Sequence, residues 1–482
     1  MPTRGIRRPT NFDANRRRFL ALGGGLAASV ALAACSNDGG SVRADASAGG
    51  DLRSVIRGRM LLPGDDGFDQ ARMPFNLAVD QSVTAVAEVA DAADAAALVR
   101  YARGARAAIS VQPSGHGASG GTNGTILVRT KRLDEVRVDA VARSVRVGAG
   151  ASWGQLQAAV APHGLTGLAG STPAVSVAGY TLGAGMSWFG RKHGWAADSV
   201  TAFEVVDAEG NAVRVTADSE PDLFWALRGG GGDFALVTAM ELDLYPAPAL
   251  YGGRMLWPVD RAPQVLEAFR AVTAEAVDEL SVWFNLLKPP GAGRPMVGID
   301  AVYLGEVAAG EGLLRRFDGI GGRMSDNRRA LPITELGAIA AEPTTPGRAQ
   351  GHTQLLTRLD DDTVQQLLAK PIDPLLIVQI RHLGGAFAGP SDSPAGAVAE
   401  PYQITFQGLP TTPDAAAAIR ARVQDYRAAL GPRLSSRTPF TFLAPGQSAA
   451  DAFTPDALAR LRGIKRRVDP SGVFRSNYSV LT

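Results

Sequence analysis

The sequence predicts an α+β fold of two lobes, and three observations support this fold class. Residues 84–111 combine an apolar run, an alanine-rich helical stretch and a second apolar run, which is typical of a β-α-β unit. Glycine-rich stretches at 112–121, 167–185 and 228–234 separate strand patterns from helix patterns in the same lobe. Beyond residue 248, strand-like runs alternate with helical segments, which predicts a second lobe with an antiparallel sheet covered by helices on one face.

The first lobe is expected to open with a strand at 85–89 and a helix that ends at Arg103. Asp91 precedes the helix, and its carboxylate suits the N-cap position because it can accept a hydrogen bond from the first turn. A strand at 107–111 then leads directly into the glycine-rich loop at 112–121. Further strands are expected at 125–128, 145–148 and 235–245, and further helices at 153–163 and 221–227.

In the second lobe, the apolar run at 375–383 predicts a strand whose side chains alternate between two faces. Gln379 and Arg381 therefore share one face, and Ile380 and His382 share the other. Other strands of this lobe are expected at 280–287, 296–304 and 402–409, and a basic amphipathic helix is expected at 455–468.

Composition indicates a folded globular protein, since 45% of the 482 residues are hydrophobic and 20% are charged. The net charge of +2 conceals a basic N-terminus, because the first 34 residues carry six arginines and one acidic residue. The rest of the chain has 43 basic and 46 acidic residues, and no basic run. This charge pattern argues against a nucleic-acid partner.

The N-terminus is expected to be an export signal over residues 1–35. Arg16-Arg17-Arg18-Phe19-Leu20 precedes an apolar stretch too short to span a bilayer, which favours a twin-arginine signal over an ordinary secretory one. Leu32-Ala33-Ala34-Cys35 then matches a lipoprotein box. Cys35 is the only cysteine, so we expect it to be lipidated, with simple cleavage after an Ala-x-Ala site as the alternative. The protein would then be a cell-envelope lipoprotein or a free periplasmic or extracellular protein, in contact with membrane only through the lipid.

Several common cofactor and metal signatures are absent. Residues 148–153 and 183–188 begin like dinucleotide fingerprints, but each has tryptophan in place of the third glycine, so a nicotinamide site is not supported. No phosphate-binding loop with a Gly-Lys-Ser/Thr ending occurs. The five histidines lack metal-ligand spacing, so no metal is expected.

His116 lies between two glycines in a loop whose bare amides could cradle a diphosphate. By itself a Gly-His-Gly segment is more simply a solvated loop histidine. The other motifs of the chain reverse this interpretation. They occur in the following order: Ser114-Gly115-His116; Gly170 to Gly179; Leu182 to Gly185 followed by Arg191-Lys192-His193-Gly194; Asp222 to Arg228 with four glycines after it; and Arg460 to Asn477.

In this order, the motifs resemble those of the berberine-bridge-enzyme-like branch of the vanillyl-alcohol-oxidase and p-cresol-methylhydroxylase (PCMH) flavoprotein superfamily. The resemblance covers residues 76–245 and 456–478. It implies a PCMH-type FAD-binding domain of two α+β subdomains, together with a substrate domain whose antiparallel sheet is covered by helices. The implied division is a tether and N-terminal segment at 36–75, the FAD-binding domain at 76–248, the substrate domain at 249–430 and a C-terminal segment at 431–482 that returns to the FAD domain.

The resemblance also implies FAD as cofactor, with a covalent bond from the histidine matching His116 to the flavin's C8-methyl group. Some members add a second bond from a cysteine, but here that position is Thr172, so a single bond is expected. The implied cofactor-binding residues are His116, Pro113, Ser114, Gly115, Gly117, Ala118, Gly170, Ser171, Thr172, Val175, Ser176, Gly179, Tyr180, Gly183, Gly185, Val237 and Asn477.

Two departures from the family pattern affect the chemistry. Many members carry a Tyr-x-Asn motif whose tyrosine is the catalytic base, and residues 439–443 have neither residue. Asp233 stands where asparagine is usual after the glycines. The base is therefore unassigned from sequence, and the candidate catalytic residues are Arg381, Gln379, Tyr402 and Tyr478, with His382 as a further candidate.

The expected function is an FAD-dependent oxidoreductase that takes hydride from a small alcohol, sugar-like or secondary-metabolite substrate. Electrons would pass to covalent flavin and then to oxygen or another acceptor. The sequence leaves open whether the protein is an oxidase or a dehydrogenase. Two rivals are a catalytically degenerate flavin-binding lipoprotein and a lipoprotein binding module without flavin.

Overall fold

A computed structural model describes residues 51–291 and 293–482. These residues belong to one compact unit. The expected signal, Cys35 and residues 36–50 of the tether lie outside the described residues. None of the helices in the described part of the chain is both long and apolar enough to cross a membrane.

The first sheet has the order β1-β2-β4-β3, in which β2, β4 and β3 are parallel and β1 is antiparallel to β2. Helix α2 packs beside it, and its Asp91 cap accepts a hydrogen bond from the Asp94 amide, as the sequence predicts. The connection from β3 to β4 carries His116. The bounds are β1 Arg59–Leu61, β2 Ala85–Glu88, β3 Ile109–Val111, β4 Ile126–Arg129, α1 Phe68–Arg72 and α2 Ala92–Gly104.

The second sheet is antiparallel, with the order β5-β6-β10-β8-β9. Helix α3 begins at a capping box formed by Ser152 and Gln155, and it ends at Val160 rather than at residue 163. A 3-10 turn containing Pro162 follows, because proline has no amide to continue the helical ladder. The bounds are β5 Val136–Asp139, β6 Ser144–Gly148, β8 Val200–Val206, β9 Ala212–Val215, β10 Leu236–Asp243, α3 Trp153–Val160, α4 Val177–Leu182, α5 Gly190–His193 and α6 Pro221–Leu227; short strands β7 Leu165–Thr166 and β11 Tyr245–Pro246 pair with each other.

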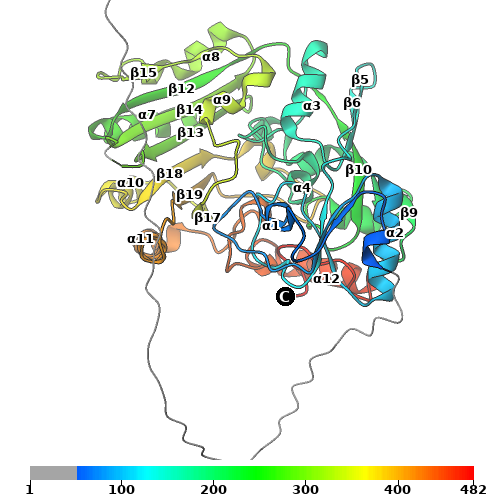
Figure 1. Cartoon of the computed structure of the whole chain (residues 1–482). Helices are drawn as coiled ribbons and strands as arrows, with labels where there is room; N and C mark the ends of the chain where they lie inside the picture. The colour runs from blue at the N-terminus through cyan, green and yellow to red at the C-terminus, as the bar shows by residue number, and fades with distance from the viewer. Residues whose placement is uncertain (1–50, 292) are drawn as a thin grey trace, which may run out of the picture. The chain divides into compact units, whose positions relative to one another are not determined.

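The third sheet has eight strands, all in antiparallel pairs, in the order β15-β12-β14-β13-β18-β19-β17 with β16 beside β12 (Figure 1). Helices α7, α8, α10 and α11 form a core with one face of it, into which Phe284, Ile380 and Phe406 project. The bounds are β12 Leu250–Pro258, β13 Leu280–Leu287, β14 Met296–Leu304, β15 Ser325–Asp326, β16 Arg329–Ala330, β17 Gln350–Leu356, β18 Leu375–His382, β19 Tyr402–Gly408, α7 Ala262–Ala274, α8 Val307–Leu314, α9 Gly337–Ala340, α10 Asp361–Leu368 and α11 Pro413–Leu430.

The last segment packs against the first two sheets. Helix α12, Pro455–Val468, lies against α6, and the chain after it runs beside β3. The Ile109 amide donates to the Val473 carbonyl over 2.6 Å, and the Arg475 amide donates to the Ile109 carbonyl over 2.9 Å. Because the described chain forms one compact unit, its division into the three expected domains stays a prediction.

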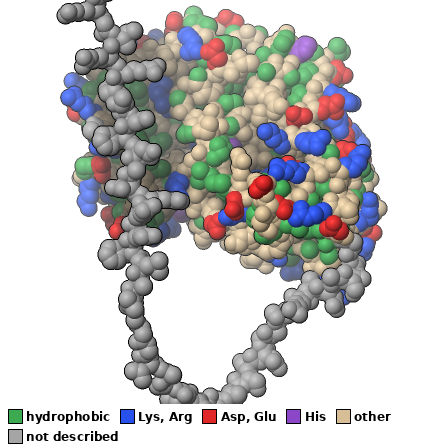
Figure 2. Space-filling model, viewed as in Figure 1, with side chains coloured by type: hydrophobic (Ala, Val, Ile, Leu, Met, Phe, Trp, Pro, Cys, Tyr) green, Lys and Arg blue, Asp and Glu red, His purple; other side chains and the backbone are tan. Residues whose placement is uncertain are grey.

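The fold class expected from the sequence is confirmed, as an α+β fold with an antiparallel sheet in its second part. The expected strands and helices occur with ends shifted by at most a few residues. On the face shown in Figure 2, basic and acidic side chains are interspersed.

Candidate functional site

A cavity of about 1610 Å³ lies between the His116 loop and the third sheet. It exceeds the roughly 300–1,000 Å³ typical of a small-molecule site. Residues 116–120 and Thr172 line one side, and the sheet face opposite to the helices lines the other. Segments 340–349 and 442–445 also line it, together with the β19–α11 connection and residues of α11 as far as Arg427. The cavity therefore joins the expected cofactor loop to the expected substrate sheet.

His116 is fixed in place by two neighbours. Its Nδ1 lies 2.9 Å from Ser114 Oγ, and its ring stacks on Phe75 with 3.7 Å between centroids. Its Nε2 is buried and has no hydrogen-bond partner among the described residues. Burial lowers the pKa of His116 to about 4, so the imidazole is neutral at pH 7. Gly115 has a φ of 79°, and a Cβ there would lie 2.8 Å from Pro74 Cα, so the close turn requires glycine.

Asn477 contacts the same loop from the far end of the sequence. Its Oδ1 accepts long hydrogen bonds from the Ser119 amide, at 3.4 Å, and from Gln112 Nε2, at 3.5 Å. Ser119 Oγ donates to the Asn477 carbonyl. A Cβ on Gly121 would lie 2.5 Å from that carbonyl oxygen. Only tertiary structure brings these residues together.

Hydrogen bonds to Asp233 and Lys465 hold the segment that carries Asn477 in place. The Asp233 carboxylate accepts hydrogen bonds from the Ser476 and Val480 amides, each over 2.7 Å. An aspartate accepts at both oxygens, whereas the asparagine usual in the family could accept at one only. Lys465 Nζ donates to the Asp233 carbonyl at 2.6 Å, to Asp469 Oδ2 at 2.6 Å and to the Phe474 carbonyl at 2.7 Å. We call this set of residues the C-terminal clamp.

The second expected cofactor loop carries Tyr180 on α4. The ring of Tyr180 packs so closely on Gly185 that a Cβ there would lie 2.4 Å from Tyr180 Cε1. Its hydroxyl is buried without a partner among the described residues, and burial raises the pKa of Tyr180. The remaining expected cofactor residues lie on the β3–β4 connection (Pro113, Ser114, Gly115, Gly117, Ala118), on the segment from β7 to the start of α4 (Gly170, Ser171, Thr172, Val175, Ser176), within or just after α4 (Gly179, Gly183, Gly185) and in β10 (Val237).

A chain of buried polar side chains crosses the cavity face of the third sheet. Arg254 on β12 binds both oxygens of Asp300 on β14, at 2.5 and 2.8 Å. Asn285 on β13 donates to Asp300 Oδ2 over 3.1 Å and accepts from Gln379 on β18 over 2.8 Å. Gln379 Oε1 then accepts a hydrogen bond from Arg381 Nε over 2.6 Å. The predicted alternation is therefore observed, because Gln379 and Arg381 line the cavity while Ile380 joins the core.

Arg381 lies at the end of this chain, 7% exposed. Its guanidinium carbon lies 3.8 Å from the centroid of Trp283 and 5.1 Å from that of Phe442. Glu342 Oε1 is 4.0 Å from Arg381 Nη2. Burial lowers the pKa of Arg381, and the nearby Glu342 opposes this shift.

Sequence reasoning did not single out Arg254, Asn285, Asp300 or Glu342. The signal available for Asn285 and Asp300 was a lone polar residue within a long apolar strand, which marks a buried partner or a cavity face. Glu342 carried no such signal, because it follows Ala341 in a loop whose left-handed conformation is visible only in the structure.

Tyr402, Tyr478 and His382 do not line the cavity. The Tyr402 hydroxyl lies 3.0 Å from Thr273 Oγ1, on the helix side of the sheet. The Tyr478 hydroxyl donates to the Leu443 carbonyl over 2.7 Å. His382 Nε2 lies 3.2 Å from Arg191 Nη1. Each of these three side chains therefore has a polar contact within the protein and no place in the cavity lining.

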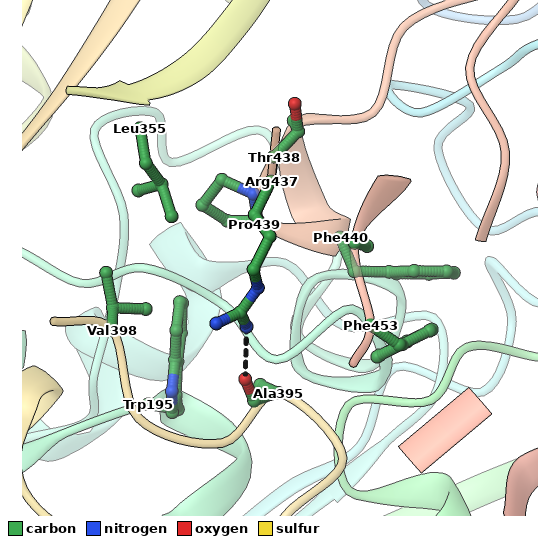
Figure 3. Close-up of a pocket in the computed structure, with 10 residues that line it drawn as sticks. Trp195, Leu355, Ala395, Val398, Arg437, Thr438, Pro439, Phe440 and Phe453 are labelled. Carbon is green, nitrogen blue, oxygen red and sulfur yellow. Dashed lines mark hydrogen bonds between the residues drawn. The ribbon is translucent and has the colours of Figure 1, made fainter. Parts of the chain in front are cut away.

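A second, much smaller pocket holds about 10 Å³, the space of a single water molecule (Figure 3). Trp195, Phe440 and Phe453 surround it, and Arg437 crosses it to donate to the Ala395 carbonyl over 3.2 Å. It is too small for a substrate. Among residues 51–291 and 293–482, no group of three or more His, Cys, Asp or Glu side chains is placed to hold a metal ion.

The residues of the large cavity fit a flavin cofactor. His116 Nε2 and Tyr180 Oη are buried polar atoms without partners, one on each of the two loops expected to surround FAD. Buried polar groups in proteins are almost always satisfied, so the unpartnered Nε2 of His116, a residue that lines the cavity, fits a ligand bound there. A neutral histidine beside the cavity also suits the expected bond to the flavin.

Comparison with known proteins supports this interpretation. Residues 83–216 match the family described as FAD binding domain. The chain is 27% identical over 455 residues to (R)-6-hydroxynicotine oxidase of Paenarthrobacter nicotinovorans, covering 88% of this chain and 97% of that relative. In fold it resembles Physcomitrella patens BBE-like 1, with a TM-score of 0.78 at 18% identity, covering 88% of this chain and 97% of the other. It also resembles a chitooligosaccharide oxidase, with a TM-score of 0.76 at 18% identity and the same coverage.

The cavity geometry, the FAD-binding match and the full-length relative agree with one another and with the motifs of the sequence. Residues 83–216 form an FAD-binding domain, and the chain is an FAD-dependent oxidoreductase with the fold of a berberine-bridge-enzyme-like protein.

Proposed function

We propose that this protein oxidises a small hydroxylated organic substrate with FAD bound covalently to His116. The observation that carries the proposal is that one cavity contains both His116 and the polar face of β18. When bound, FAD supplies the hydride acceptor, and the reduced flavin is returned to its oxidised state by oxygen or another acceptor.

The contacts of His116 favour Nε2 as the bonding atom. Nδ1 is engaged by Ser114 Oγ, whereas Nε2 is free and the ring is neutral. Stacking on Phe75 holds the ring in one orientation, which reduces the entropy lost when the bond forms. Joining the nitrogen to the C8-methyl carbon removes two electrons and two protons overall, which oxygen takes up. Thr172 offers no thiol, so the bond to His116 is the single link.

Relatives indicate which substrates to test first. One relative is named as an oxidase of 6-hydroxynicotine, and a structural neighbour is named as an oxidase of chitooligosaccharides. Both 6-hydroxynicotine and chitooligosaccharides belong in the first substrate panel, along with simple alcohols and sugars. Turnover with any of them would exclude the degenerate flavin-binding rival, and comparison of oxygen with an artificial acceptor would distinguish an oxidase from a dehydrogenase.

The covalent bond is tested by acid precipitation of purified protein, followed by the absorption spectrum of pellet and supernatant. Flavin should remain with the pellet of the wild type and pass into the supernatant for His116→Ala. His163→Ala is a matched control, because His163 is an exposed histidine of the same lobe and should leave the flavin in the pellet. Release of flavin from the wild type would exclude the covalent bond. Protein that remains colourless even after addition of FAD would exclude the enzyme.

We also propose that the N-terminus directs export through the twin-arginine route and that Cys35 carries the lipid. The support is the arginine motif followed by the only cysteine of the chain. Radiolabelled palmitate should label the wild type and not Cys35→Ser. Equal labelling of both proteins would exclude the lipid anchor.

A further inference from the structure

Arg381 differs from the other buried arginines in how few of its N–H donors have a hydrogen-bond partner. Arg191 donates to the carbonyls of Leu280, Leu383, Ala276 and Val277, and Arg228 pairs with both oxygens of Asp392. Arg381 makes one hydrogen bond, from Nε to Gln379. Among the described residues, neither of its Nη nitrogens has a hydrogen-bond partner, and both belong to a side chain that lines the large cavity.

The aromatic neighbours hold the guanidinium plane. Trp283 lies against it at 3.8 Å and Phe442 at 5.1 Å, so rotation of the group is restricted while the two Nη nitrogens stay uncovered. The bond from Nε to Gln379, which is itself held by Asn285, fixes the position of the group along the sheet. The guanidinium is thus a preorganised fork of donors rather than a mobile surface charge.

The charges around Arg381 leave it incompletely neutralised. Asp300 belongs to the same chain of side chains, but both of its oxygens are taken by Arg254. Glu342 approaches only to 4.0 Å and is 36% exposed. Farther out, the lining carries three more arginines, Arg348, Arg420 and Arg427, as well as Lys288, which lies 3.8 Å from Asp373, and one more acidic side chain, Asp80, which pairs with Arg72. The cavity is therefore positively biased, which attracts anions.

We propose that the hydroxylated substrate also carries a carboxylate, whose two oxygens bind the two Nη nitrogens of Arg381 in place of the loose contact with Glu342. This inference rests on the proposed function. A single planar fork with amide neighbours suits a planar monoanion, whereas a phosphate would need a second cation at the same point. Leu376, Ile377 and Met296 also line the cavity, so an apolar or aromatic body beyond the carboxylate is accommodated.

Isothermal titration calorimetry on the purified protein, after incubation with FAD, tests this inference with benzoate and its neutral isostere benzamide. Benzoate should bind, and benzamide should bind at least about a hundredfold more weakly, as expected when a buried cation loses its partner. Inorganic phosphate should bind no better than benzamide. Failure of benzoate to bind, equal binding of benzamide, or tighter binding of phosphate would each overturn the proposal.

Variants of Arg381 test the same inference in a second way. Arg381→Gln should lose benzoate binding by about a hundredfold. Arg381→Lys, which keeps the charge but not the fork, should recover only part of the affinity. Arg358→Gln is the matched control, because this exposed arginine lies outside the cavity lining and should change benzoate affinity by less than about threefold. Circular dichroism and flavin content check that each variant is folded and loaded.

The outcomes separate this inference from the function on which it rests. If benzoate affinity is unchanged in Arg381→Gln while the flavin spectrum shifts, Arg381 serves the cofactor and the carboxylate proposal is wrong, but the flavoenzyme stands. If the protein binds benzoate through Arg381 but never acquires flavin, the proposed function fails and the anion site stands.

Discussion

Two buried cations in this protein differ in how many of their N–H donors are hydrogen-bonded. Lys465, in the C-terminal clamp, is 2% exposed and uses all three of its N–H donors, on two carbonyls and on Asp469. Arg381, on the cavity face of β18, is 7% exposed and uses one of five donors on another residue. Burial alone therefore does not distinguish structural charges from binding charges.

What distinguishes them is how completely the donors are satisfied. Removing a charge from water is unfavourable, and full hydrogen bonding offsets most of this penalty at Lys465. At Arg381 this penalty is only partly offset, so an additional hydrogen-bond acceptor would stabilise the buried charge. We infer that the clamp stabilises the fold and positions Asn477, whereas Arg381 contributes little to stability and much to binding.

The largest effect is expected for Lys465→Met. This change removes the cation paired with the buried Asp469 carboxylate and the Nζ donor of the Asp233 and Phe474 carbonyls, and should destabilise the protein by about 3–5 kcal/mol. Denaturant unfolding measures the free energy of unfolding. Arg466→Met, one residue along α12 and exposed, should change it by less than about 0.5 kcal/mol. Similar losses in both variants would show that the clamp has no special role.

A smaller effect is expected for Asp233→Asn. The amide nitrogen of asparagine cannot accept a hydrogen bond, so either the Ser476 or the Val480 amide would lose its partner, at about 1–3 kcal/mol. Hydrogen exchange should show increased opening of residues 476–480, next to Asn477. Unchanged exchange there would mean that the family's usual asparagine serves this chain equally well.

The smallest effect on stability is expected for Arg381→Met. Loss of one hydrogen bond to Gln379 is offset by removal of an incompletely neutralised buried charge, so the free energy of unfolding should change by less than about 1 kcal/mol. Unfolding of the flavin-free protein measures this directly. A loss as large as that of Lys465→Met would remove the distinction between the two cations.

Local patterns predicted much of the fold. The alternation in β18 separated Gln379 and Arg381 from Ile380, because the period of a strand is a local property of the backbone. The order of the glycine-rich motifs indicated the FAD-binding lobe, and the match over residues 83–216 confirms it. The candidates Tyr402, Tyr478 and His382 could not be judged in this way, since any aromatic or polar side chain can equally well pack or line a cavity.

The sequence by itself determined the fold class, the cofactor and the loop that carries His116, because these depend on short-range patterns and on motifs in a fixed order. Only the tertiary structure decided that Asp233 accepts from Ser476 and Val480, and that the polar residues of β12, β13, β14 and β18 form one chain ending at Arg381. The physical reason is that hydrogen-bond satisfaction depends on partners from distant parts of the chain. Sheet pairing and the return of the C-terminal segment bring those partners together, and no local pattern encodes which donors will remain free.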